Sequence, residues 1–114
     1  MEKYSIKYSP AALDDLDQVW LEVLSASGSI NITDQYVNDL LKVISSKSSF
    51  PYSGTPLIYM GEATGIYYII FKSYMAFYRI SGDNLEVGRI LFARSDYMKI
   101  LFGKSEFIPE DTDN

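Results

Sequence analysis

The first part of the chain changes from an alternating pattern of apolar and polar residues to a helical one. Tyr4, Ile6 and Tyr8 alternate with polar residues, which predicts a half-buried β-strand. Ser9 and Pro10 follow as an N-cap residue and a first-turn proline, so a helix is expected to begin there. The apolar residues of this helix share one face: Leu13, Leu16, Trp20, Val23 and Leu24.

A second helix is expected after a short connection. Gly28 is the expected end of the first helix, and Thr33 with Asp34 is expected to begin the second. The apolar positions of the second helix have the spacing i, i+3, i+4 and i+7: Val37, Leu40, Leu41 and Ile44. Because the connection is short, the two helices are predicted to form an antiparallel hairpin.

The middle of the chain combines turn-forming residues with apolar runs of strand length. Proline and glycine punctuate the segment Phe50–Gly65, which is therefore expected to be a loop. Three runs rich in Ile, Tyr and Phe follow: Ile66–Lys72, Tyr74–Ile80 and Leu85–Phe92. Lys72 and Ser73 form a tight link, and Ser81–Asn84 has strong turn chemistry. These runs predict an antiparallel meander.

The end of the chain predicts one short helix and an acidic tail. Asp96 is placed to cap a helix over Tyr97–Phe102. Residues 105–114 are acidic and are expected to be loose, although Phe107 and Ile108 could dock them.

The order of elements is strand, helix, helix and three strands, with a short helix last. The helix pair must bury its apolar stripes, and the sheet offers the only large partner surface. We therefore expect an α+β fold in which an antiparallel sheet carries the helical hairpin on one face. The opposite sheet face is expected to stay open and to carry exposed arginine and aromatic side chains.

Composition narrows the class of protein. The chain has 114 residues, a mass of 13.0 kDa and 47% hydrophobic residues, so a single folded domain is expected over residues 1–104. The absence of Cys and His excludes disulfides and thiol nucleophiles, and removes the usual general base and zinc ligand. The longest apolar run, Ile66–Phe71, is too short to cross a membrane, and the N-terminus has no signal-peptide pattern. A cytoplasmic protein is the expectation.

Charge is distributed unevenly along the chain. The formal net charge is −5, which argues against a general nucleic-acid binder. However, residues 66–104 are net basic and hold all three arginines, Arg79, Arg89 and Arg94. A local basic surface on an acidic protein is one interpretation. The alternative is that these arginines pair with nearby acidic residues: Asp83, Glu86 and Asp96.

Five segments occur in an order and spacing that together resemble a known family. They are Tyr8–Ala12, Tyr36–Ile44, Phe50–Gly54, Phe77–Ile80 and Arg89–Asp96. On these segments the chain, over residues 4–102, resembles the RelE/ParE superfamily of toxins from type II toxin–antitoxin systems, and it looks closest to the ParE-like branch. The resemblance implies a β-α-α-β-β-β fold, in agreement with the order predicted above.

The sequence departs from the family pattern at residues that matter for RNA cleavage. Phe92 stands where the ribonuclease branch often has His, and Ser95 stands where it has a second Arg. The first meander strand starts with Ile66, where the family often has Arg. Many members are basic, whereas this chain is acidic. These changes bear on catalysis more than on the fold.

The resemblance and the basic segment indicate the same candidate side chains. The candidates for target binding are Arg79, Arg89, Arg94 and Asp96. If the chain is an enzyme, the catalytic candidates are Arg79, Arg89, Arg94 and Tyr97. Arginines could neutralise a phosphate, and a tyrosine, lysine or carboxylate would have to act as acid or base. No cofactor or metal is expected.

Each candidate also has a purely structural interpretation. Arg79 could pair with Glu86 across the turn, and Arg89 must either face the open side or be paired inside. Arg94 and Asp96 could form a local ion pair. One acidic cluster is expected to be a solvated helix start rather than a metal site: Asp14, Asp15 and Asp17.

The expected partner is a cognate antitoxin. The resemblance implies a toxin that this antitoxin neutralises and that inhibits growth by binding a target such as DNA gyrase. The alternatives are a RelE-like ribosome-dependent mRNA endoribonuclease and a non-toxic relic of the fold. The apolar segment Leu57–Met60 is expected to pack under the antitoxin or against a second copy in a homodimer, or else to cover one end of the helix–sheet core.

Overall fold

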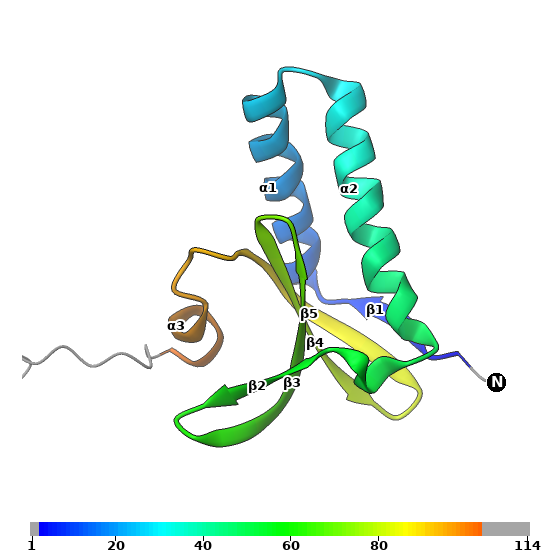
Figure 1. Cartoon of the computed structure of the whole chain (residues 1–114), viewed down its shortest axis with the longest axis vertical. Coiled ribbons are helices and arrows are strands. Elements are labelled where there is room, and N and C mark those ends of the chain that lie inside the picture. The colour runs from blue at the N-terminus through cyan, green and yellow to red at the C-terminus, as the bar shows by residue number, and fades with distance from the viewer. Residues whose placement is uncertain (1–2, 104–114) are drawn as a thin grey trace, which may run out of the picture.

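A helical hairpin packs against one face of a five-stranded sheet (Figure 1). The computed structural model describes residues 3–103, so the expected acidic tail and its Phe107 and Ile108 lie outside the described residues. The elements in chain order are β1 (Ser5–Tyr8), α1 (Pro10–Ser27), α2 (Ile30–Ser45), two short 3₁₀ turns (Ser46–Ser48 and Pro51–Ser53), β2 (Thr55–Tyr59), β3 (Glu62–Phe71), β4 (Tyr74–Ser81), β5 (Asn84–Phe92) and α3 (Tyr97–Phe102).

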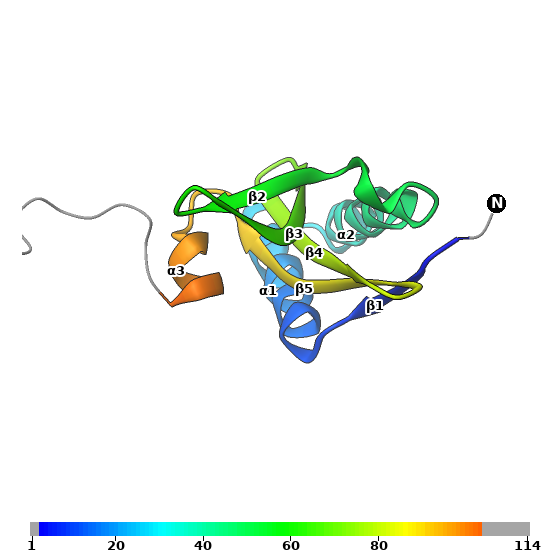
Figure 2. The same cartoon turned by 90° about the horizontal axis from the view of Figure 1, so that it is seen from below.

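The strand order across the sheet is β1-β5-β4-β3-β2. β2 to β5 pair antiparallel with their neighbours, as the predicted meander requires. β1 instead lies parallel to β5, so the sheet is mixed. Figure 2 shows the hairpin on one side of this sheet and α3 at the other end of the molecule. The expected α+β architecture is confirmed.

The boundary of the second helix differs from the expectation. α2 begins at Ile30 rather than at Thr33, because the side chain of Ser29 accepts a hydrogen bond from the amide of Ile32 and caps the helix. Thr33 is buried inside the first turn, where its hydroxyl donates to the carbonyl of Ser29. Gly28 ends α1 in the left-handed conformation, as predicted.

The segment expected to be a loop contains a strand. The loop expectation over residues 50–65 is wrong beyond Gly54, because β2 and the start of β3 form an antiparallel hairpin there. Met60 and Gly61 have φ values of 54° and 79°, which suits a tight hairpin turn. Pro56 is tolerated because β2 is the outermost strand of the sheet. Proline and glycine therefore gave a misleading loop signal.

The preceding turn is tied to the sheet by one buried tyrosine. The Tyr78 hydroxyl donates to the carbonyl of Pro51 at 2.6 Å and accepts from the amide of Gly54 at 3.1 Å. A Cβ at Gly54 would overlap that hydroxyl, so only glycine fits without a shift. These contacts give a physical reason for the glycine of this turn.

The core has two parts, one on each face of the sheet. The larger part fills the space between the hairpin and the sheet and includes Val19, Leu40, Ile44 and Val87. The smaller part lies on the opposite face, where α3 packs over a buried group: Leu57, Met75, Phe77 and Leu91. The expectation of an open face is therefore only partly correct, because the apolar side of α3 needs burial as well.

The apolar segment Leu57–Met60 belongs to the smaller core. Leu57 is buried there, and the ring of Tyr59 stacks on Phe102 of α3 at 4.3 Å between centroids. The segment thus closes one end of a core, although it is the smaller core and not the one beneath the hairpin. A contact with a partner protein stays a prediction.

Within residues 3–103, no helix combines the length and apolar character that crossing a membrane requires.

Candidate functional site

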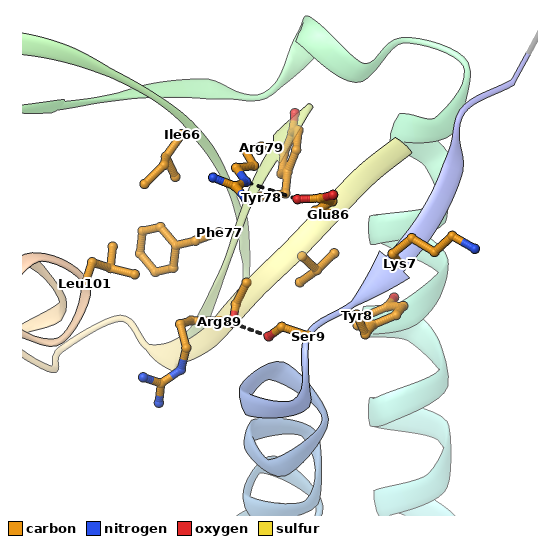
Figure 3. Close-up of a pocket in the computed structure, with 12 residues that line it drawn as sticks. Lys7, Tyr8, Ser9, Ile66, Phe77, Tyr78, Arg79, Glu86, Arg89 and Leu101 are labelled. Atoms are coloured by element: carbon orange, nitrogen blue, oxygen red, sulfur yellow. Dashed lines mark hydrogen bonds and ion pairs between the residues drawn. The ribbon is translucent and has the colours of Figure 1, made fainter. Parts of the chain in front are cut away.

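A pocket of about 390 Å³ opens on the sheet face opposite the hairpin and is lined by residues of β1, β3, β4, β5 and α3 (Figure 3). Its apolar side is formed by Ile66, Phe77 and Leu101, and its polar side carries the cations Lys7, Arg79 and Arg89. The remaining lining residues are Tyr8, Ser9, Tyr78, Glu86, Val87 and Gly88. The structure thus brings two of the predicted arginines into one concave surface.

A β-bulge places Arg89 on the pocket side. Val87 pairs with Tyr78 while Arg89 pairs with Phe77, so Gly88 is the extra residue in β5. In a regular strand, Glu86 and Arg89 are three residues apart and would point to opposite faces. The bulge shifts the register by one residue and brings both to the same face. Alternation alone could not have predicted this arrangement.

Arg79 is held by a neighbour on the adjacent strand. Its Nε donates to Oε1 of Glu86 at 3.0 Å, and the two residues are direct partners in the β4–β5 register. The structural interpretation of Arg79 as a cross-turn pair is confirmed. The Arg79 side chain is 69% exposed, so this pair contributes little to stability. Its terminal amino groups face solvent beside the pocket.

Arg89 is fixed by a carboxylate of α1. Its Nε and one terminal nitrogen donate to the two oxygens of Asp15 at 2.8 and 3.0 Å, and the backbone amide of Ile90 donates to the same carboxylate at 2.8 Å. This bidentate hydrogen bonding to Asp15 raises the pKa of Arg89 above its ordinary value, so the guanidinium stays charged. The alternative in which Arg89 is paired inside is therefore confirmed.

Asp15 also protects a strand edge. β1 ends at Tyr8, so the edge of β5 beyond Val87 has no strand beside it. Ser9 continues the pairing with its amide and hydroxyl, which donate to the carbonyls of Val87 and Gly88. Asp15 then accepts a hydrogen bond from the backbone amide of Ile90, further along the same edge. The expectation that Asp15 is merely solvated is wrong; Asp14 and Asp17 are exposed, as expected.

The other predicted site residues do not line the pocket. Arg94 is exposed in the turn after β5 and forms no ion pair with Asp96 or any other residue within 3–103. Asp96 caps α3 by accepting from the amide of Lys99, as predicted. Tyr97 packs its ring against Phe77 at 5.4 Å between centroids. The structure therefore leaves Arg94, Asp96 and Tyr97 outside the group of residues that line the pocket.

Lys7 is the pocket cation that the sequence did not single out. It lies on β1 and is exposed at the pocket rim. The alternation of β1 showed only that Lys7 points away from the hairpin. That this face of β1 adjoins Arg79 and Glu86 depends on the parallel pairing with β5, which no local pattern reveals.

A second, more open cavity of about 690 Å³ lies where the free end of the hairpin meets the sheet. The Tyr74 hydroxyl donates to Oε1 of Glu22 at 2.6 Å across it. Burial, this hydrogen bond and the negative charge of Glu22 raise the pKa of Tyr74. Exposed Ile32 and Phe92 lie at its margin.

The chemistry of the first pocket suits binding more than proton transfer. An apolar floor with cations at its rim fits an anionic or amphipathic group. Burial raises the pKa of Tyr8 and of Tyr78, which makes both phenols poorer acids and poorer bases at neutral pH. Among residues 3–103, no three acidic side chains gather as they would around a metal ion.

Three solved structures share this fold. A chromosomal ParDE toxin–antitoxin system from P. aeruginosa aligns with a TM-score of 0.67 and 18% identity, over 81% of this chain and 98% of that chain. The toxin–antitoxin complex RelBE2 from Mycobacterium tuberculosis aligns with a TM-score of 0.55 and 19% identity, over 81% and 93%. A YoeB/ParE toxin from Agrobacterium tumefaciens aligns with a TM-score of 0.50 and 20% identity, over 77% and 96%.

Sequence comparison at the family level agrees with the structural one. No curated protein matches the chain in sequence. The model of one family, described as the ParE toxin of the type II toxin–antitoxin system parDE, matches residues 6–97 and so covers every element from β1 to the start of α3. The chain therefore belongs to the ParE toxin family of type II toxin–antitoxin systems.

Proposed function

We propose that this toxin arrests growth by binding a cellular target without catalysing a reaction on it, and that a cognate antitoxin neutralises it. The resemblance to ParE-like toxins suggests DNA gyrase as the target. The antitoxin is supported by the solved relatives, two of which are described as toxin–antitoxin systems or complexes.

The observation that carries the proposal is that both pocket arginines form ion pairs with carboxylates of the same chain. Cleavage of RNA through its 2′-hydroxyl needs a base, an acid and cations free to meet the developing phosphate charge. Here Asp15 engages two nitrogens of Arg89. Glu86 contacts Arg79 only through Nε within residues 3–103, so Arg79 is the pocket arginine with both terminal nitrogens left for a phosphate. The chain has no His, and the pKa values of Tyr8 and Tyr78 are raised rather than lowered. These features favour binding over catalysis.

One observation favours a ribonuclease as the second candidate. Lys7, Arg79 and Arg89 lie around one pocket, which is the kind of surface that a phosphate group could occupy. The net charge of −5 opposes docking to ribosomal RNA, because phosphate neutralisation supplies most of that affinity. We therefore rank the ribonuclease second.

The deciding experiment is induced expression of the full chain in bacteria. Growth of cells expressing the wild type is compared with that of Arg79→Ala and Arg94→Ala, and 5′ ends of cellular RNA are sequenced. Lys42→Ala is the matched control, because Lys42 is an exposed cation of α2 on the other side of the molecule. Purified toxin is added in parallel to a gyrase supercoiling assay.

We expect growth arrest with intact mRNA and inhibited supercoiling, relieved by Arg79→Ala or Arg94→Ala and unchanged by Lys42→Ala. Arrest with mapped cuts in translated mRNA would show that the ribonuclease candidate is correct. Intact mRNA with normal supercoiling would mean that the toxin binds another target. Normal growth at good soluble expression would identify a non-toxic relic.

A further inference from the structure

The pocket on the open sheet face has two chemically distinct halves. Phe77 forms the floor and is 1% exposed, and the half-buried Ile66 and Leu101 stand beside it. Figure 3 shows these three apolar side chains on one side and Lys7 on the far side, with Arg79 between them. A ligand that fits must present an apolar group followed by negative charge.

The rim cations retain donors for such a ligand. Glu86 accepts a hydrogen bond from Nε of Arg79, and no second acceptor contacts that guanidinium within residues 3–103. Lys7 forms no ion pair within residues 3–103. An arginine has five N–H donors and a lysine has three, so both can donate hydrogen bonds to a further carboxylate. Arg89 is less available, because Asp15 engages two of its nitrogens.

The chain itself carries a segment of matching chemistry. Residues 104–114 follow Gly103, and Leu101, two residues earlier, already lines the pocket. The segment contains the apolar pair Phe107 and Ile108, and after them come three carboxylates: Glu110, Asp111 and Asp113. An extended chain of this length reaches roughly 35 Å, which is ample for a pocket that Leu101 already lines.

We propose that the C-terminal segment 104–114 docks into this pocket of its own chain. Phe107 and Ile108 cover the apolar floor, and the following carboxylates meet Lys7 and Arg79. The segment then competes with any anionic ligand for the same surface, so it acts as a built-in competitor. This proposal does not depend on which cellular target the toxin has.

Covalent attachment makes such docking effective even with few contacts. A short tether gives a local concentration in the millimolar range, so a contact too weak to detect between separate molecules is substantially occupied. The charged part of the contact lies at an exposed rim, where salt screens it within about 10 Å at 0.1 M. Docking should therefore weaken in high salt without disappearing, because the apolar anchor is insensitive to screening.

The absence of Cys makes a direct test straightforward. A nitroxide spin label is attached to Thr112→Cys in the full chain, and the broadening of backbone amide NMR signals is recorded. The proposal predicts strong broadening at Lys7, Arg79 and Gly88, and none at Leu21 or Ile30 on the far hairpin. Mixing labelled protein with unlabelled, isotope-enriched protein separates docking within one chain from docking onto a second copy.

Two sets of variants decide the outcome. Lys7→Glu should reduce the broadening several-fold, and exchanging Glu110 and Asp111 for lysine in that variant should restore it. Lys3→Glu is the matched control, because Lys3 is an exposed lysine that lies outside the pocket. The double variant Phe107→Ser, Ile108→Ser should abolish the effect. Broadening that is weak everywhere, centred on another face, seen only between molecules, or unaffected by these variants would overturn the proposal.

Discussion

Asp15 binds the guanidinium of Arg89 and so limits the contacts that Arg89 can make with a ligand. A bidentate carboxylate orients the guanidinium along the edge of β5 and neutralises its charge. The same carboxylate accepts a hydrogen bond from the backbone amide of Ile90. One side chain thus pairs a free amide at the edge of β5 and also positions the arginine. One of the three arginines that the sequence offered as site residues is therefore engaged in holding the fold together.

Replacing this carboxylate should destabilise the protein. Asp15→Asn leaves the guanidinium of Arg89 without its charged partner, and we expect a loss of about 1–3 kcal/mol in the free energy of unfolding. Asp14→Asn is the matched control, because the neighbouring Asp14 is exposed. Urea denaturation of both variants measures the difference. Equal stability of the two variants would contradict a structural role for the Asp15–Arg89 contact.

The contact between Tyr74 and Glu22 should make stability depend on alkaline pH. The pKa of Tyr74 is raised above its ordinary value of 10.0 in the folded protein, so its contribution is complete below that value and is lost as pH rises toward the folded pKa. The stability difference between wild type and Tyr74→Phe should be constant up to about pH 9 and should shrink above about pH 10. Chemical denaturation across this range measures it.

The control for this pH dependence is Tyr52→Phe, which removes a hydroxyl from a side chain that is 63% exposed. Its stability difference from wild type should not follow the same curve. If the Tyr74→Phe difference stays flat through the alkaline range, the hydroxyl is not held by Glu22 in solution.

At the scale of elements, α3 depends on its packing. A helix of six residues is too short to be stable alone. Tyr97, Leu101 and Phe102 attach it to the smaller core, and Phe102 stacks on Tyr59 of β2. Because Leu101 also lines the pocket, the position of this helix determines the shape of the apolar half of the site.

Removing the stacked ring should loosen this helix first. Phe102→Ala should accelerate amide hydrogen exchange over residues 97–102 by about tenfold, while exchange in α1 and α2 stays nearly unchanged. Ile100→Ala is the comparison, since Ile100 lies on the same helix and is 44% exposed. Similar exchange in the two variants would mean that the stack does not anchor α3.

At the scale of the whole molecule, net charge opposes RNA binding. The net charge is −5, and the pocket gathers three cations, Lys7, Arg79 and Arg89, on one concave surface. Long-range electrostatics therefore repel a polyanion even where local contacts could form. A partner that places an apolar group beside a few carboxylates suits the pocket better than a polyanionic nucleic acid does.

The toxin should accordingly bind a ribosomal RNA hairpin no more tightly than about 10⁻⁴ M at physiological salt. Fluorescence anisotropy with a labelled hairpin measures this affinity. Tighter binding that Arg79→Ala weakens would favour the ribonuclease candidate. Tighter binding that Arg79→Ala leaves unchanged would show that RNA contacts a surface other than the pocket.

Local pattern was sufficient wherever residues close in sequence determine the structure. The alternation of β1, the Ser9 cap, the apolar stripe of α2 and the meander were all predicted correctly, because capping and periodicity act over a few residues. Pattern failed for β2, where edge position overrides the loop signal of Pro56. It also failed for the start of α2, where both Ser29 and Thr33 are residues of a type that caps helices and Ser29 is the one that does so.

The sequence by itself therefore determined every α-helix and strand except β2, their order along the chain and, through the five segments of the resemblance, the family. Only the tertiary structure decided the site. Asp15 and Arg89 are 74 residues apart, and they meet because β1 lies parallel to β5 and ends early. The bulge at Gly88 then turns Arg89 to the pocket side. Both depend on strand pairing across the whole chain, which short-range propensity does not encode.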